Sequence, residues 1–276
     1  MMATTDKKIS LGEVQETLLI PLYLRAKNTK SENPNINDQE AVKLCDSIDY
    51  DFSKFDSAKG SYYGVVSRTI ILDREVQNYI NKHPDCVIVN IGCGLCTRNL
   101  RLDLKQAKWY NLDLEDVIEL REKYLTPKEN CFNVTASLLD DSWPTLVDSG
   151  DKNVLLVIEG VLMYFSEEEV KQFIQIVKKH YKKVDMYAEV MHSAMARHTK
   201  QHDTVTKTNA SFKWGIAHSK DFEKLDRGIK YITEWNFVDE MANFGGFFMK
   251  LSSKIYFIKN FCDKIGVYEI TADAEN

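Results

Sequence analysis

The chain of 276 residues is long enough for one large α/β domain with an added cap, and its 44% hydrophobic and 28% charged composition is that of a folded globular protein. A net charge of −5 argues against an electrostatic nucleic-acid site. No run approaches the ~18 apolar residues needed to span a bilayer, and the opening sequence MMATTDKKIS contains no apolar signal segment, so we expect a cytoplasmic protein without membrane contact.

Apolar residues at helical spacing predict three helices before residue 85. They cover residues 11–30, the segment after the candidate N-cap Asp38, and residues 62–80. The polar stretch 29–37 between the first two contains Pro34 and is typical of a loop. We therefore expect residues 1–85 to form a helical cap on a sheet that follows them.

From residue 87 onward, short apolar runs alternate with helical patterns. The predicted strands cover residues 87–91, 109–112, 131–134, 154–158 and 184–190, and a helix is expected after Leu114. Ser166 and Glu169 form a capping box before the helix that precedes the fifth strand. This alternation predicts right-handed crossovers and a mainly parallel sheet, so we assign residues 86–190 to the core of a single domain.

After the fifth strand the pattern becomes irregular. Residues 191–228 contain His192, Trp214 and His218 among polar residues, and we expect an insertion or lid there. Two final strands are predicted at 231–237 and 254–261, with a helix around 238–244 between them. Residues 229–276 would thus close the sheet as an antiparallel hairpin.

The first predicted strand runs directly into Gly92-Cys93-Gly94, a turn that brings bare backbone up to the crevice above a sheet. The second strand ends in Asp113, a carboxylate that can accept hydrogen bonds from both hydroxyls of a ribose. A dinucleotide site requires G-x-G-x-x-G, and Thr97 replaces the third glycine. The pattern favours S-adenosylmethionine, which has no phosphates, over a dinucleotide and over a glycine turn without a ligand.

Ligands of open α/β sheets bind beyond the carboxyl ends of the strands, so the residues after strands one to four should converge. Asp113 would bind the ribose, and Ser137 and Leu138 would border the adenine. Glu159 would lie near the sulfonium and the amino group. Helix capping is the alternative role for Asp113 and for Glu159.

Six cysteines, at positions 45, 86, 93, 96, 131 and 262, lack the spacing of a disulfide scaffold. Cys93 and Cys96 form a C-x-x-C directly after a strand, as in some redox motifs. No second such pair exists to complete a zinc site. We expect reduced cysteines that serve packing, and no bound metal.

Three motifs together resemble the leucine carboxyl methyltransferase family, and within it the tetracenomycin-type bacterial polyketide O-methyltransferases. They are N-x-G-x-G-x-x-T-R at 90–98, D-L followed by V-I-E-L at 113–120, and E-G-V-L-M-Y at 159–164. The similarity runs over residues 13–191. It implies a class I, Rossmann-like methyltransferase with a seven-stranded, mostly parallel sheet, which transfers a methyl group from sulfonium to oxygen and releases S-adenosylhomocysteine.

The resemblance also implies roles for individual residues. Arg68, in G-V-V-S-R-T, matches an arginine that pairs with the methionine carboxylate of the cofactor, and Arg25 or Lys27 matches a further basic residue. With the strand ends, the expected cofactor-binding residues are Arg68, Asn90, Gly92, Cys93, Gly94, Asp113, Leu114, Ser137, Leu138, Glu159 and Gly160.

The sequence departs from the family pattern at two places. Cys96 occupies the position of the aspartate in G-x-D-T-R, and the sequence Ser137-Leu138-Leu139-Asp140 replaces D-L-R-D, which removes a contact to the adenine. These departures motivate an alternative hypothesis, a catalytically silent member that serves as a binding module.

The methyl acceptor determines whether a base is required. A carboxylate, with a pKa near ~4, is ionised at pH 7, whereas a phenol, with a pKa near ~10, needs a base or a lowered pKa. Tyr164, His192 and His218 are candidates for that base, and Arg25 and Trp214 are candidates for contacts with the acceptor. We expect a small-molecule carboxylate or phenol, and the terminal carboxyl group of a protein is the alternative acceptor.

Overall fold

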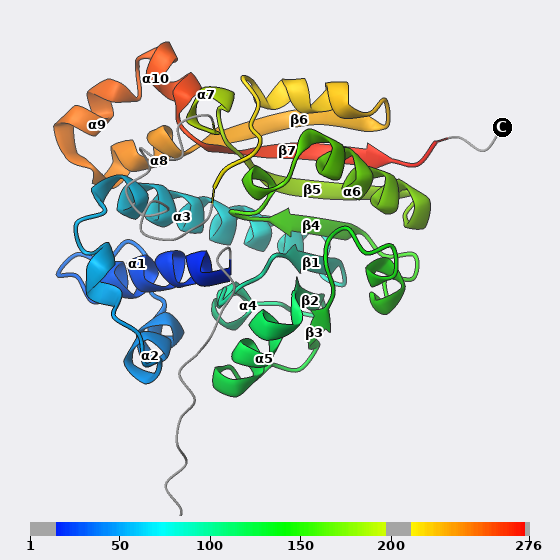
Figure 1. Ribbon diagram of the computed structural model, residues 1–276, viewed down its shortest axis with the longest axis horizontal. Coiled ribbons are helices and arrows are strands. Elements are labelled where there is room, and N and C mark those ends of the chain that lie inside the picture. Colours follow the sequence, from blue (N-terminus) through cyan, green and yellow to red (C-terminus); the bar gives the residue numbers. More distant parts are fainter. Residues whose placement is uncertain (1–14, 197–210, 274–276) are drawn as a thin grey trace, which may run out of the picture.

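A seven-stranded sheet with the order β3-β2-β1-β4-β5-β7-β6 forms the centre of the computed structural model, which describes residues 15–196 and 211–273 (Figure 1). The strands β1 to β5 pair in parallel, and β7 is antiparallel to both β5 and β6. The predicted α/β class with a mostly parallel seven-stranded sheet is confirmed. The strands are β1 (Val87–Ile91), β2 (Lys108–Asp113), β3 (Cys131–Thr135), β4 (Val154–Ile158), β5 (Lys183–Val190), β6 (Ile229–Asn236) and β7 (Lys264–Thr271).

The two central strands, β1 and β4, are buried at every position. Their sequences, VIVNI and VLLVI, are nearly continuous apolar runs, as strands covered on both faces require. Val87 and Val89 pack toward Phe173 on one face, while Ile88 packs toward Ile71 on the other. Both strands were predicted with these bounds, and β2, β3 and β5 are each one or two residues longer than the predicted strands.

Two long helices cover the faces of the sheet. The helix α3 (Lys59–Lys82) lies on one face and α6 (Glu167–His180) on the other (Figure 1). The capping box at the start of α6 is confirmed, because Ser166 Oγ accepts a hydrogen bond from the Glu169 backbone N–H and the Glu169 carboxylate accepts one from the Ser166 N–H. The other helices and 3₁₀ turns are η1 (Gln15–Leu18), α1 (Leu19–Thr29), α2 (Gln39–Ser47), η2 (Phe52–Phe55), α4 (Arg98–Arg101), α5 (Glu115–Tyr124), η3 (Trp143–Leu146), η4 (Leu162–Tyr164), α7 (Ser193–Ala196), η7 (Ser219–Leu225), α8 (Phe237–Phe244), α9 (Gly246–Ser252) and α10 (Tyr256–Phe261).

The N-terminal helices pack over the end of β1. Leu22 of α1 and Leu44 of α2 belong to one apolar cluster with Leu95, which follows the glycine loop. Asp38 caps α2 as predicted, since its Oδ1 accepts a hydrogen bond from the Ala41 N–H at 3.0 Å. The helices of this N-terminal segment therefore agree with the spacing of its apolar residues, although α1 begins at Leu19 after the 3₁₀ turn η1.

The prediction of a final strand at 254–261 was wrong. Residues 256–261 form α10, and the last strand begins three residues after it, at Lys264. The segment is rich in aromatic residues, which favour strands, but Tyr256 and Phe257 are 75% and 70% exposed and have no strand neighbour. The residues 264–271 instead pair with the whole of β5 and bury Ile265, Tyr268 and Ile270, so burial decided which segment joined the sheet.

The predicted insertion 191–228 contains α7 and η7 in its described parts, and residues 197–210 lie outside the described residues. No helix in the described ranges is long and apolar enough to cross a membrane.

Candidate active site

A cavity of about 1020 Å³ opens at the carboxyl ends of the parallel strands. Its lining follows the order of the sheet, from residues 136–138 after β3 and Asp113 at the end of β2, through residues 92–96 after β1 and 159–161 after β4, to Glu189 and Met191 at the end of β5. The strand order reverses between β1 and β4, which is where ligands of open α/β sheets bind. The cavity thus occupies the position at which a cofactor is expected.

All eleven residues that we expected to bind the cofactor lie in the lining of this cavity. Tyr164 and Arg25, proposed respectively as a base and a substrate contact, also line it. His192 and Trp214 do not. The ring of His192 stacks on Phe261 with 4.5 Å between centroids, and Trp214 is buried in the core against Phe222.

The glycine loop after β1 requires its glycines for steric reasons. Gly92 and Gly94 have φ angles of +62° and +47°, a region that residues with a Cβ rarely adopt. A Cβ on Gly92 would also lie 2.3 Å from Cγ2 of Val161, which follows β4. The loop therefore brings the backbone of β1 against the end of β4, and only glycine fits there.

Asp113 at the end of β2 holds this loop through its carboxylate. Its Oδ2 accepts a hydrogen bond from the Gly94 N–H, and its Oδ1 accepts one from the Leu114 N–H, both at 2.8 Å. Helix α5 begins at Glu115 with Leu114 as its N-cap, without a side-chain capping bond, so Asp113 is not the cap of that helix. Burial raises the pKa of Asp113 and the two backbone N–H groups oppose the rise.

Two buried arginines hold the same loop from behind. Arg121 of α5 donates from Nη1 to the carbonyl oxygens of Gly94 (2.9 Å) and Cys96 (2.8 Å), and Arg25 donates from Nη2 to that of Leu95 (2.9 Å). The role of Arg121 was not predicted. The signal was its position four residues after Val117, on the apolar face of α5, where a charged residue needs a buried partner.

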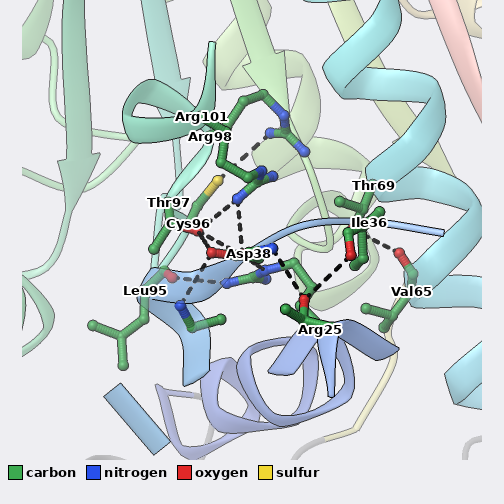
Figure 2. Close-up of polar contacts among 12 residues, drawn as sticks. Arg25, Ile36, Asp38, Val65, Thr69, Leu95, Cys96, Thr97, Arg98 and Arg101 are labelled. Atoms are coloured by element: carbon green, nitrogen blue, oxygen red, sulfur yellow. Dashed lines mark hydrogen bonds and ion pairs between the residues drawn. The ribbon is translucent and has the colours of Figure 1, made fainter. Parts of the chain in front are cut away.

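Arg25 is also one of three residues that hold the buried carboxylate of Asp38, which Figure 2 shows at the centre of the group. Arg25 Nε and Arg101 Nη1 each lie 2.8 Å from Asp38 Oδ2, and the Thr97 hydroxyl lies 2.7 Å from it. Burial alone would raise the pKa of Asp38, but Arg25 and Arg101 outweigh it and lower the pKa to about 2. The charge of Arg25 is thus directed at Asp38, which joins the N-terminal helices to the glycine loop.

A second ion-pair network lies at the end of β4. Glu159 pairs through Oε1 with Arg68 Nε (2.9 Å) and through Oε2 with Arg98 Nη2 (2.8 Å), and Arg68 Nη1 reaches Glu189 Oε2 at 3.0 Å. Arg98 and Arg68 outweigh the effect of burial and lower the pKa of Glu159 to about 2. Burial, by contrast, raises the pKa of Glu189. Glu189, the penultimate residue of β5, was not predicted as a site residue.

Arg98 shows how the chain accommodates its departure from the family motif. Arg98 Nη1 donates to Cys96 Sγ at 3.6 Å, and Arg98 Nε pairs with Asp73 at 2.7 Å. The guanidinium therefore keeps two carboxylate partners, Asp73 and Glu159, although cysteine replaces the aspartate of the motif.

The six cysteines carry no disulfide. Cys93 is buried within the glycine loop, and burial raises its pKa, so its thiol stays protonated and is a poor nucleophile. Among the residues in the described ranges, no group of three His, Cys, Asp or Glu side chains is arranged to hold a metal ion.

The lining beyond β4 and β5 is apolar and rich in sulfur and aromatic rings. It contains Met163, Met191, Met195, Phe212, Phe237, Met241, Phe257 and Phe261. Tyr164 lies against Phe212, with 5.6 Å between ring centroids, and burial raises its pKa, so the hydroxyl stays protonated and is poorly suited to act as a base. Burial and Lys264 lower the pKa of His192, which lies outside the lining.

Asp263 is a second carboxylate in the cavity lining, besides Glu189, that the sequence prediction missed. It lies directly before β7, whereas the prediction of the final strand at 254–261 placed Asp263 after that strand. Burial and the neighbouring Glu189 raise its pKa to about 7, although Arg68 and Lys264 oppose the rise.

The cavity residues fit S-adenosylmethionine in three observed respects. Asp113 is a half-buried carboxylate in the lining, suited to ribose hydroxyls. Arg68 brings a guanidinium charge to the lining, and it could pair with a carboxylate of the cofactor. Asn90 Nδ2 is buried in the lining and makes no hydrogen bond there, which is costly unless a ligand accepts it.

Comparisons with known proteins agree with this geometry. The family model of the leucine carboxyl methyltransferases matches residues 19–178. The chain is 29% identical over 232 residues to the tetracenomycin polyketide synthesis O-methyltransferase TcmP of Streptomyces glaucescens, covering 84% of this chain and 86% of TcmP. It is 26% identical over 272 residues to the S-adenosyl-L-methionine-dependent methyltransferase dpfgK of Gibberella zeae, covering 89% of this chain and 90% of dpfgK.

Among solved structures, a candidate methyltransferase from Thermobifida fusca YX has the same fold, with a TM-score of 0.60, 12% sequence identity, and 97% of each chain covered.

Proposed function

The chain belongs to the leucine carboxyl methyltransferase family, and we propose that this S-adenosylmethionine-dependent methyltransferase acts on the hydroxyl oxygen of small phenols. The observation that carries the proposal is the composition of the cavity. Its glycine loop and strand-end acids suit an adenosyl group, and the lining continues into an apolar surface of methionine and aromatic side chains suited to a flat aromatic acceptor.

The charges in the cavity favour a phenol over a carboxylate acceptor. The cationic side chains of the described lining are Arg25 and Arg68, and each is paired with carboxylates, Arg25 with Asp38 and Arg68 with Glu159 and Glu189. An acceptor carboxylate would compete with the carboxylate of the cofactor for Arg68 and would be repelled by Glu189. A neutral phenol meets neither obstacle.

The proposed division of roles follows the sheet order. Asp113 would accept hydrogen bonds from the ribose, residues 136–138 would border the adenine, and Arg68 with Glu159 would hold the amino-acid end of the cofactor. When bound, the cofactor supplies an electrophilic methyl group on a sulfonium. The protein aligns the acceptor oxygen with that group and excludes water, and orientation of this kind can lower a barrier by ~7–11 kcal/mol.

Calorimetry with S-adenosylhomocysteine tests the cofactor site. Asp113→Asn keeps the shape of the side chain but removes its charge, so we expect S-adenosylhomocysteine to bind roughly 10- to 100-fold more weakly, as for loss of a hydrogen bond to a charged group. The control is Glu115→Gln, two residues further along, at the first position of α5. It removes a comparable charge outside the lining and should leave the affinity for S-adenosylhomocysteine unchanged. Equal binding by wild type and Asp113→Asn would contradict the assignment of the ribose site.

A panel of phenols and aromatic carboxylates, assayed for transfer of labelled methyl, tests the acceptor. We expect transfer to phenols with an apolar ring system and little or none to carboxylates. Transfer to carboxylates alone would favour the carboxyl methyltransferase alternative. Binding of S-adenosylhomocysteine without transfer to any member of the panel would favour a catalytically silent binding module.

A further inference from the structure

The segment between β6 and β7 gathers apolar side chains on the surface of the molecule. In the described parts of the chain nine large apolar side chains are exposed, and five of them lie within residues 247–257: Phe247, Leu251, Ile255, Tyr256 and Phe257. Single apolar side chains scattered over a surface are ordinary. Five on two consecutive short helices indicate a contact surface, which we call the α9–α10 surface.

These side chains come from one short stretch of the chain. Helix α9 ends at Ser252 and α10 begins at Tyr256, and the Ile255 N–H donates to the Ser252 carbonyl oxygen at 3.0 Å, so a tight turn joins the two helices. Phe247 and Leu251 are one helical turn apart and lie on the same side of α9. Figure 1 shows α9 and α10 at the periphery, outside α8. The α9–α10 surface therefore lies at an outer corner of the molecule.

The charge of this segment is opposite to that of the whole chain. Residues 246–261 contain three lysines, Lys250, Lys254 and Lys259, and no acidic residue, whereas the whole chain has a net charge of −5. Lys250 and Lys254 are exposed, and Lys259 pairs with Asp239 of α8. The α9–α10 surface thus presents cations beside its exposed rings, and it would attract an anionic partner.

We propose that the α9–α10 surface binds the face of an anionic lipid bilayer. Exposed aromatic and aliphatic side chains interleaved with lysines are typical of segments that lie in a membrane interface. The apolar side chains enter the boundary of the acyl chains, and the lysines meet the anionic headgroups. We expected no membrane contact because no run is long enough to span a bilayer, but binding in the interface does not require a spanning segment.

The charges favour a bilayer over a second copy of this chain. In a two-fold contact the same surface meets itself, so the lysines of one copy would face those of the other. Residues 246–261 contain no acid to compensate them. A bilayer also accepts side chains that project from a corner, whereas a folded partner needs a matching hollow.

The α9–α10 surface adjoins the cavity. Phe257 is 70% exposed and also lines the cavity, as do Ile258 and Phe261 of the same helix. A bilayer bound here would lie beside the apolar part of the lining. An acceptor dissolved in lipid could then enter the cavity without crossing water, whichever of its oxygens is methylated. The inference is thus independent of the class of acceptor.

Sedimentation of the full chain with lipid vesicles tests the inference. Vesicles of equal parts phosphatidylcholine and phosphatidylserine carry an anionic face, and vesicles of pure phosphatidylcholine do not. The charge variant is Lys250→Glu with Lys254→Glu. The apolar variant is Tyr256→Ser, because the Tyr256 side chain is 75% exposed and does not line the cavity.

Each variant has a matched control. Lys128→Glu with Lys152→Glu replaces two exposed lysines that shortly precede β3 and β4. They lie at the edge of the sheet opposite to α9 and α10, which join the end of β6 to the start of β7. Leu146→Ser, in η3, replaces an apolar side chain that is 55% exposed. Thermal unfolding of every variant should match wild type, because the side chains are exposed.

We expect wild type to bind the mixed vesicles roughly 10- to 100-fold more tightly than pure phosphatidylcholine, since each lysine near an anionic surface contributes about 5-fold. The charge variant should lose most of this difference. Tyr256→Ser should bind the mixed vesicles roughly 3- to 10-fold more weakly than wild type, and both controls should bind as wild type does.

Fluorescence separates insertion from adsorption through headgroups alone. With mixed vesicles, the added emission of Tyr256→Trp over wild type should shift to shorter wavelength and be quenched by lipids with brominated acyl chains. Leu146→Trp should show neither change. An unshifted and unquenched signal from Tyr256→Trp would show that the apolar side chains do not enter the bilayer, which contradicts the inference.

Two further results would overturn the inference. One is that wild type does not bind the mixed vesicles, or binds them with an affinity that neither the charge variant nor Tyr256→Ser lowers. The other is self-association that Tyr256→Ser abolishes, measured by sedimentation velocity, in a protein that does not bind vesicles, which would assign the surface to a second copy. The proposed function is tested without lipid, so it can hold when this inference fails.

Discussion

Three buried or half-buried acids of this protein have different pKa values because different groups surround each carboxylate. Asp38 and Glu159 each lie between two arginines, and their pKa values fall to about 2 despite burial. Burial and the neighbouring Glu189 raise the pKa of Asp263 to about 7, although Arg68 and Lys264 oppose the rise. The two acids that lie between arginines are therefore suited to holding structure.

The paired state of Asp38 predicts a defined dependence of stability on pH. Its folded pKa lies below its unfolded value, so its stabilising contribution is full above about pH 4 and is lost as the pH falls toward 2. Asp38→Asn leaves Arg25 and Arg101 without their buried partner and should lower the free energy of unfolding at pH 7 by about 3–5 kcal/mol.

Urea unfolding at pH 7, 4 and 2.5 measures both effects. The difference between wild type and Asp38→Asn should shrink by about 2 kcal/mol between the highest and the lowest pH, because near pH 2.5 the unfolded wild-type chain binds a proton at Asp38 that the folded chain largely does not. Asp46→Asn, which removes an exposed acid paired with Lys30, is the control and should change little at any pH. A difference that stays constant with pH would show that Asp38 does not titrate as the structure implies.

At the level of helices and strands, the prediction succeeded where one local pattern decided the structure. The runs at 87–91 and 154–158 are apolar throughout and became the two fully buried strands. The box of Ser166 and Glu169 set the start of α6. The Gly92–Gly94 turn and Asp113 came to one cavity because the order of strands in a parallel sheet fixes where their ends meet.

The prediction failed where distant residues compete for one place. Residues 254–261 and 264–271 both have the composition of a strand, and only the second can pair with β5 and bury both faces. That error of about ten residues concealed Asp263. Glu189 and Arg121 were missed because their partners, Arg68 and the carbonyls of the glycine loop, are remote in sequence.

The link from α5 to the glycine loop gives a prediction at this scale. Arg121→Met keeps the apolar stem but leaves the carbonyls of Gly94 and Cys96 without a donor, which costs about 1–3 kcal/mol for each buried group. We expect lower stability in thermal unfolding and S-adenosylhomocysteine binding roughly 10-fold weaker by calorimetry.

Arg121→Lys restores one donor and should recover part of both losses. Glu122→Gln, the next residue on the exposed side of α5, is the control and should behave as wild type. Full cofactor affinity in Arg121→Met would show that the loop holds its conformation through Asp113 alone.

In the whole molecule, one cavity joins parts that are far apart in the sequence. The N-terminal helices close it over the glycine loop, through the Arg25–Asp38 pair, and the segment between β6 and β7 closes it beyond β5. Figure 1 shows this segment, α8 to α10, grouped beside the start of β7. The contacts with the cofactor would therefore lie nearer the β3 side of the sheet and those with the acceptor nearer the β7 side. This predicts that a substitution can change the KM for one without changing the KM for the other.

The neighbours Phe257 and Tyr256 in α10 offer the test of that separation. Both are largely exposed, and only Phe257 lines the cavity. We expect Phe257→Ala to raise the KM for an apolar phenol roughly 3- to 10-fold, equivalent to about 1 kcal/mol of lost contact, and to leave the KM for S-adenosylmethionine unchanged. Tyr256→Ala should alter neither constant, and thermal unfolding of both variants should match wild type because the side chains are exposed. A larger effect on the methyl donor than on the phenol, measured in the same steady-state assay, would place the acceptor elsewhere in the cavity.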